Sequence, residues 1–158
     1  MIIRPASPDD LLTIVEFNRR LALESESITL SVELLTRGVR AALLDPQKAR
    51  YFLAEVDGRI VGQIMHTREW SDWRNGDIWW LQSVYVVEEF RRRGVFRSLV
   101  EHLRAEAQAS PDVVGLRLYV EKHNDRAAMT YDRLGLPEAG YVVREQIWRN
   151  WNSPDRTD

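Results

Sequence analysis

The segment Trp79–Glu106 constrains the fold more than any other part of the chain. In Ile78–Val87 both alternating faces are largely apolar, which is typical of an inner strand covered on both sides. Two glutamates end this apolar run, and Arg91-Arg92-Arg93-Gly94 follows as a basic turn. From Val95 onward the apolar residues recur along one helical stripe. The sequence therefore predicts a buried strand, a tight turn and an amphipathic helix.

This strand–turn–helix connection has the features of an anion-binding site. The first N–H groups of a helix have no intrahelical partners, and the positive end of the helix dipole attracts negative charge. The three arginines of the turn add positive charge. The alternative is a solvated charge run in which Gly94 serves only the backbone geometry. From these residues alone, the two interpretations have about equal support.

The remaining segments predict a single domain with a mixed sheet and helices on both faces, in the order β-α-α-β-β-β-α-β-α-β. Asp57-Gly58 joins two apolar runs and predicts a β-hairpin with a type I′ turn. We expect the domain to cover residues 1–151 and a polar tail to cover 152–158. The other expected elements are a strand at Ile2–Pro5, helices after Ser7 and Ser31, hairpin strands Arg50–Val56 and Arg59–Thr67, a loop at Glu69–Gly76, a strand at Leu116–Val120, a helix after Asn124 and a last strand at Tyr141–Trp148.

Composition narrows the class of protein. The chain has 158 residues, no cysteine and a net charge of −2. Without cysteine there is no disulfide, thiolate nucleophile or cysteine-ligated metal site. A slightly acidic chain has no general attraction to nucleic acid or anionic membrane. No signal peptide or membrane-spanning run is read, so we expect a soluble cytoplasmic protein without a metal.

Two motifs in this order resemble the GNAT superfamily of N-acetyltransferases. The turn Arg91–Phe96 is similar to the family's pyrophosphate-binding pattern [Q/R]-x-x-G-x-[G/A], which Arg91 and Gly94 match. Phe96 departs from it, and we expect its ring to point into the core. Asn124–Gly135 is similar to the family segment N-x-x-A-x-x-x-Y-x-x-x-G. The expected order of elements also matches the GNAT topology.

The resemblance implies a site for acetyl-CoA. The strand before the turn would splay from its neighbour and pair with pantetheine, and the Val86 N–H would polarise the thioester carbonyl. Asn124 would contact the cofactor arm, and Tyr131 would protonate the leaving thiolate. The alternatives are an N-cap without a ligand and a core tyrosine, and the matching positions of both residues favour the functional roles. The residues implied to bind the cofactor are Val84, Tyr85, Val86, Arg91, Arg92, Arg93, Gly94, Val95, Phe96 and Asn124.

The sequence gives weaker signals for the residues that would bind the acceptor amine or act as the base. Gln82 stands mid-strand where some relatives have an acid, and it cannot take a proton. A base must nevertheless remove a proton from an alkylammonium, whose pKa is about 10. The candidates for the base are Glu24, Glu26, Glu69 and Asp72, each of which also fits a solvated surface position. The residues Trp70 and Trp73 would line the acceptor site or, alternatively, pack under the sheet edge.

These expectations lead to an acetyltransferase that moves an acetyl group from acetyl-CoA to a primary amine by direct attack in a ternary complex. The alternative is a non-catalytic acyl-CoA-binding or regulatory module that keeps the cofactor turn. A nucleic-acid-binding domain is disfavoured by the acidic net charge. The acceptor, a small molecule or a peptide amine, stays open, as do the base, the use of other acyl groups and a homodimer.

Overall fold

The computed structural model describes residues 1–149 and shows one five-stranded sheet with the order β1-β2-β3-β4-β5. Neighbouring strands are antiparallel as far as β4, and β5 is parallel to β4. The elements are β1 (Ile2–Pro5), η1 (Pro8–Asp10), α1 (Leu11–Glu26), α2 (Val32–Leu44), β2 (Arg50–Val56), β3 (Arg59–Ser71), β4 (Gly76–Val86), η2 (Glu88–Phe90), α3 (Val95–Ala109), β5 (Val113–Leu118) and α4 (Asp125–Arg133).

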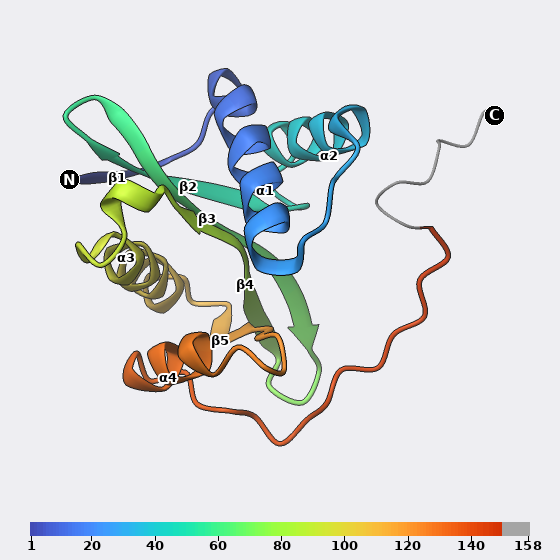
Figure 1. The fold of residues 1–158 in the computed structure, drawn as a ribbon. Helices are drawn as coiled ribbons and strands as arrows, with labels where there is room; N and C mark the ends of the chain where they lie inside the picture. The colour runs from blue at the N-terminus through green and yellow to red at the C-terminus, as the bar shows by residue number, and fades with distance from the viewer. Residues whose placement is uncertain (150–158) are drawn as a thin grey trace.

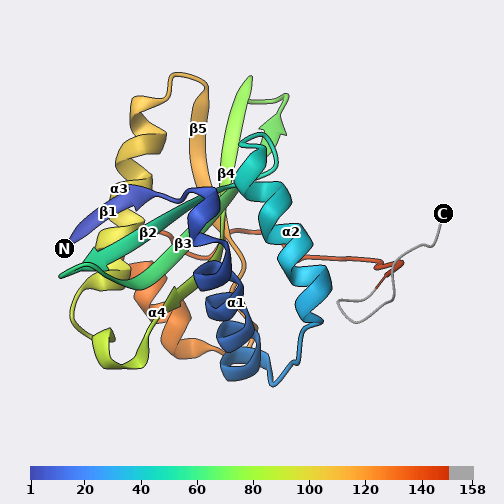
Figure 2. The same cartoon turned by 90° about the horizontal axis from the view of Figure 1, so that it is seen from above.

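Helices cover both faces of the sheet, as Figures 1 and 2 show: α1 and α2 lie on one side and α3 and α4 on the other. The alternation of side chains along β2 separates two hydrophobic cores. Tyr51 and Leu53 belong to the core beneath α1 and α2, whereas Phe52 and Ala54 belong to the core beneath α3. The apolar stripe of α3 is buried in this second core, with Leu99 and Leu103 fully inaccessible.

Local signals in the sequence explain where several elements begin and turn. Asp57 and Gly58 have φ values of 50° and 76°, the left-handed pair that a type I′ hairpin turn requires. The Ser31 side chain accepts a hydrogen bond from the Leu34 N–H at 3.3 Å and caps α2. Asn124 caps α4 in the same way through the Ala127 N–H at 3.0 Å. These three predictions are confirmed.

The β3–β4 connection is shorter than expected. The segment Glu69–Gly76 was expected to be a loop, but β3 extends through Ser71 and β4 begins at Gly76. Only a tight turn remains between them. The reason is cross-strand pairing, which continues through Glu69↔Ile78 and Trp70↔Asp77 despite the polar side chains. Glu69 and Trp70 are therefore strand residues.

The predicted last strand at Tyr141–Trp148 is wrong for the described chain. These residues form no strand, and Trp148, at the end of the expected strand, has 82% of its surface exposed. The alternating pattern supplies side chains suited to a strand, but a strand also needs a partner edge, and the segment makes no ladder with β5. The end of the proposed domain at residue 151 and the proposed tail 152–158 lie outside the described residues. No helix within residues 1–149 is long and apolar enough to cross a membrane.

Candidate functional site

The candidate site begins where β4 and β5 separate. Their pairing ends at Leu81↔Leu118, whereas β4 continues to Val86. The Val87 N–H donates to Val61 O of β3 at 3.0 Å. Because successive backbone groups of a strand point to opposite sides, the Val86 N–H points away from β3 into the opening. The sheet thus presents an unpaired stretch of β4 just before the basic turn.

A β-bulge lies at the start of this unpaired stretch. The register between β3 and β4 shifts between Gln63 and Met65, and Ser83 has a φ of 48°. The Gln63 side chain is fully buried and its Nε2 donates to Ser83 O at 3.1 Å. A buried amide therefore holds the bulge, and the bulge bends the end of β4 away from β5.

The basic turn leaves the N-terminus of α3 uncapped. Arg92 and Gly94 have φ values of 60° and 84°, so two left-handed residues make the turn. Gly94 is the N-cap residue, and no side chain caps this end. The first helical hydrogen bond runs from the Ser98 N–H to Gly94 O at 3.0 Å. The N–H groups of the first turn of α3 consequently have no intrahelical acceptor and remain suited to an anion.

Arg91 is already committed to protein contacts. Its Nε donates to Val86 O at 2.9 Å, and its Nη2 donates to a carboxylate oxygen of Glu24 at the end of α1. Tyr85 O–H donates to the other oxygen of Glu24 at 2.9 Å. Burial disfavours the charged form of Glu24, but the bonds from Arg91 and Tyr85 outweigh it and hold its pKa below the usual value. A carboxylate held in this way is a poor base.

The other arginines of the turn stay in solvent. Arg92 and Arg93 are exposed, and the Arg93 guanidinium lies 5.3 Å from the Phe90 ring centroid. Phe96 is half-buried, contacts the α3 core and meets the Tyr131 ring edge-on at 5.6 Å. The Phe96 ring thus packs between α3 and α4, in line with the expectation that it points inward.

Asn124 and Tyr131 line one pocket of about 330 Å³ next to the opening. The residues that follow β5 form its opposite wall, and Ser25 and Glu26 from the end of α1 close it. Burial raises the pKa of the Tyr131 hydroxyl, so this group stays protonated at neutral pH and can donate a proton. The structure therefore brings together the two residues of the downstream motif.

Four of the candidates for the base or the acceptor site lie away from both pockets. Glu69, Trp70, Asp72 and Trp73 gather at the β3–β4 hairpin, which is at the opposite end of β4 from the basic turn, about 33 Å along the strand. Glu69 accepts from Arg117 Nη1 at 3.0 Å and from Trp80 Nε1. Trp70 and Trp73 are 59% and 86% exposed. None of the four lines either described pocket.

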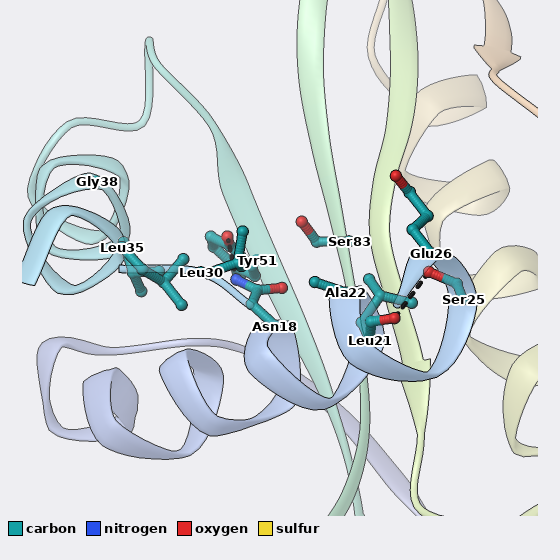
Figure 3. Close-up of a pocket in the computed structure, with 11 residues that line it drawn as sticks. Asn18, Leu21, Ala22, Ser25, Glu26, Leu30, Leu35, Gly38, Tyr51 and Ser83 are labelled. Carbon is teal, nitrogen blue, oxygen red and sulfur yellow. Dashed lines mark hydrogen bonds between the residues drawn. The ribbon is translucent and has the colours of Figure 1, made fainter. Parts of the chain in front are cut away.

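A second pocket, of about 280 Å³, opens between α1, α2 and the β4 bulge (Figure 3). Asn18, Tyr51 and Ser83 line it, and Gln63 joins them from behind because its Nε2 donates to Asn18 Oδ1 at 2.8 Å. The sequence reasoning missed these residues. The available signal was a polar side chain on each of two otherwise apolar stripes, Asn18 on α1 and Gln63 on β3, because buried polar groups need partners.

Comparison with known proteins identifies the family. The model of the acetyltransferase (GNAT) family matches residues 15–136. An N-alpha-acetyltransferase from Sulfurisphaera tokodaii is 30% identical over 145 residues, which cover 86% of this chain and 80% of that protein. The crystal structure of a possible acetyltransferase from Clostridium difficile 630 has 45% identity and a TM-score of 0.89, covering 94% of this chain and 98% of that one. The structure of a predicted acetyltransferase from Clostridium acetobutylicum with acetyl-CoA has 17% identity and a TM-score of 0.76 over 92% of this chain and 95% of that one. The expected mixed α/β fold is confirmed.

Proposed function

Because the chain belongs to the GNAT family of acetyltransferases, we propose that it transfers an acetyl group from acetyl-CoA to a primary amine. The observation that carries the proposal is the unpaired stretch of β4, which leads directly into an uncapped helix N-terminus. Few folds offer strand-like backbone donors and a phosphate-binding helix end side by side. An elongated ligand with an amide-containing arm and a pyrophosphate fits both.

The backbone supplies most of the donor site. The pyrophosphate binds the free N–H groups at the start of α3. The amide-bearing pantetheine arm pairs with β4 from Val84 to Val86, as an added strand would. The Val86 N–H then donates to the thioester carbonyl oxygen, where negative charge develops during attack. Tyr85 contributes through its bond to Glu24, which fixes α1 against this stretch.

Proton transfers complete the reaction. The amine nitrogen attacks the thioester carbon, the new C–N bond forms and the C–S bond breaks. The departing thiolate takes a proton from the Tyr131 hydroxyl, which lies in the pocket beside the opening and is protonated at neutral pH. As the amide forms, the nitrogen loses its second proton, which restores the Tyr131 hydroxyl directly or through water. Overall an alkylammonium and acetyl-CoA give an amide, free CoA and one proton, which the solvent receives.

Ligand binding tests the donor site. Acetyl-CoA at about 100 times its dissociation constant should raise the free energy of unfolding by roughly 2.7 kcal/mol. The variant Gly94→Val should abolish this increase, because a β-branched residue disfavours a φ of 84° and disturbs the turn. Gly58→Val is the matched control, since Gly58 also has a left-handed φ and open space around its Cβ position but lies in the β2–β3 hairpin.

Both variants should lose similar stability, and only Gly94→Val should lose the response to acetyl-CoA. An equal response in the two variants would contradict the placement of the pyrophosphate. The release of CoA over an amine panel then separates an enzyme from a binding module. A protein that acetyl-CoA stabilises but that releases no CoA with any amine would be the acyl-CoA-binding module.

A further inference from the structure

None of the residues proposed to bind the donor lines the pocket between α1, α2 and the β4 bulge. In Figure 3 Tyr51, Leu30 and Leu35 lie at one end of it, Glu26 and Ser25 lie at the other, and Ser83 stands between them. Its volume of about 280 Å³ is at the lower limit for ligand pockets, which measure about 300–1,000 Å³. It therefore has room for one small group of a ligand rather than for a large molecule.

The deep wall of this pocket is polar but uncharged. Tyr51 and Asn18 are each 7% exposed, and Asn18 Nδ2 donates to the Tyr51 hydroxyl oxygen at 3.3 Å. The Ser83 side chain is a second hydrogen-bonding neighbour of the Tyr51 hydroxyl. Burial raises the pKa of Tyr51, so the group stays neutral. This wall can bind an uncharged polar atom, and it offers no counter-charge.

The rest of the lining is apolar with a single charge. Leu30 and Leu35 contribute apolar surface on the α2 side. Among the residues that line the pocket, Glu26 carries the only charge, and none is a lysine or arginine. A carboxylate on the ligand would thus be desolvated without a cation, and a second ammonium group would enter without a second acid. Both groups are disfavoured.

Glu26 lies where the two pockets meet. Ser25 and Glu26 line this pocket and also the pocket that contains Tyr131. Glu26 differs in this respect from Glu24, whose carboxylate is held by Arg91 and Tyr85. A ligand whose ammonium group meets Glu26 can place its body among the leucines and its nitrogen toward the donor side.

We infer that the acceptor is a monoamine with an uncharged, apolar body, bound in this pocket with its nitrogen beside Glu26. The inference rests on the proposed function and specifies the acceptor of that reaction. Glu26 takes the proton of the alkylammonium, directly or through water, and passes it to solvent. The nitrogen lone pair then attacks the thioester carbon. Both the α-amine of a peptide with an apolar first residue and a free alkylamine have this chemistry.

Four amines test the class, of which three share an isobutyl group and the fourth, spermidine, is a linear polyamine. Leucinamide and 3-methylbutylamine carry a single positive charge, leucine adds a carboxylate, and spermidine adds further ammonium groups. We expect kcat/KM for the first two to exceed that for leucine and spermidine by about tenfold or more, as one unpaired charge at a half-exposed site costs about 1.4 kcal/mol or more. The α-amine of leucinamide has a pKa of about 8 and the alkylamine one of about 10, so the two values of kcat/KM are compared per concentration of free amine. On that scale a higher value for leucinamide indicates the peptide source, and the reverse indicates the alkylamine.

The variant Gly38→Leu tests whether the acceptor binds in this pocket. Gly38 lies within α2 and lines the pocket, and a Cβ built on it meets no atom within 4 Å. The Cβ of a leucine therefore fits without a clash, leucine favours the helix, and we expect its larger side chain to reduce the pocket volume. We expect kcat/KM for leucinamide to fall by about tenfold or more while the dissociation constant of acetyl-CoA is unchanged. Gly38→Ala is the control that changes the backbone preference but adds little volume.

The variant Glu26→Gln tests the carboxylate. It should lower kcat/KM for amines by about 10²-fold or more and shift the pH–rate profile, with unchanged binding of acetyl-CoA. The control Glu101→Gln removes an exposed carboxylate of α3 that pairs with Arg97 at 3.7 Å and should leave the rate unchanged.

These outcomes distinguish a failure of the inferred acceptor class from a failure of the proposed acetyltransferase function. A preference for leucine or spermidine, or equal rates for Gly38→Leu and the parent protein, would overturn the inference and leave the acetyltransferase intact. An absence of CoA release with every amine would instead overturn the proposed function.

Discussion

Acid should destabilise this protein through one buried histidine. His66 on β3 is 1% exposed, and its ring stacks on Trp79 with 3.8 Å between centroids. Neither ring nitrogen has a hydrogen-bond partner of normal geometry. Burial, followed by repulsion from Arg50, lowers the pKa of His66 from 6.5 to about 4, and the nearby Thr67 backbone offsets this only in part.

The sign and size of this loss of stability follow from the protonation of His66 in the unfolded and folded states. Between pH 6.5 and about pH 4 His66 is protonated in the unfolded chain and neutral in the folded one. The unfolded state then binds more protons, so the free energy of unfolding decreases as the pH falls through this range. A pKa difference of about 2.5 units corresponds to about 3 kcal/mol at 1.36 kcal/mol per unit. The loss begins near pH 6.5 and is complete below about pH 4.

Urea unfolding followed by far-ultraviolet circular dichroism at a series of pH values measures this loss. The variant His66→Phe keeps an aromatic ring against Trp79 and removes the proton-binding group. We expect the free energy of unfolding of this variant to decrease less than that of the parent below pH 6.5, by up to about 3 kcal/mol. His123→Gln, at an exposed site, is the control. Parallel curves for His66→Phe and the parent protein would refute the reasoning.

Two further variants examine the downstream motif. Tyr131→Phe should lower kcat by about 10²-fold or more and leave the dissociation constant of acetyl-CoA unchanged, because the hydroxyl acts on the leaving group, and equal turnover would return Tyr131 to a packing role against Phe96. Asn124→Ser keeps a residue that can cap α4 and should change the free energy of unfolding by less than about 0.5 kcal/mol, while a raised KM for acetyl-CoA would show that the Asn124 amide contacts the cofactor.

Most of the fold that the sequence predicts follows from local patterns of residues. The strand Ile78–Val87 is apolar on both faces, in agreement with the position of β4 between β3 and β5 and with helices on both faces of the sheet. Asp57-Gly58 specifies its turn through two left-handed φ values. Each of these signals lies within about ten residues of sequence. Pattern and structure agree where the physical cause is local.

The parts that sequence did not predict depend on distant partners. The segment Tyr141–Trp148 alternates as a strand does, yet strand formation needs an edge that pairs with it, and no pattern within the segment supplies one. The bulge at Ser83 depends on a register shift that Gln63 stabilises from the neighbouring strand. The pocket between α1, α2 and the β4 bulge unites Asn18, Tyr51 and Ser83, which only the packing of α1 on the sheet brings together.

The three arginines of the turn should have different roles. The Arg91 charge is compensated by Glu24, and its side chain also binds Val86 O. Within residues 1–149, Arg92 and Arg93 are exposed and make no ion pair. Neutral variants of Arg92 and Arg93 should therefore affect a different substrate from a neutral variant of Arg91. Arg92→Gln and Arg93→Gln should raise the KM for acetyl-CoA and weaken its salt dependence, because they remove charges that are free to meet a phosphate.

Arg91→Gln should act mainly on the acceptor. Its partner Glu24 lies two residues before Glu26 on α1, so loss of the Arg91–Glu24 pair loosens the helix end that lines both pockets. Both side chains of the pair are more than 40% exposed, so a double-mutant cycle of Arg91→Gln and Glu24→Gln should give a coupling of only about 0.2–1 kcal/mol in stability. The kinetic signature is a KM for amine that rises more than the KM for acetyl-CoA. If Arg91→Gln raises the KM for acetyl-CoA more than Arg92→Gln does, Arg91 leaves Glu24 to bind the cofactor, and the pair is a competitor of the phosphate rather than a support for α1.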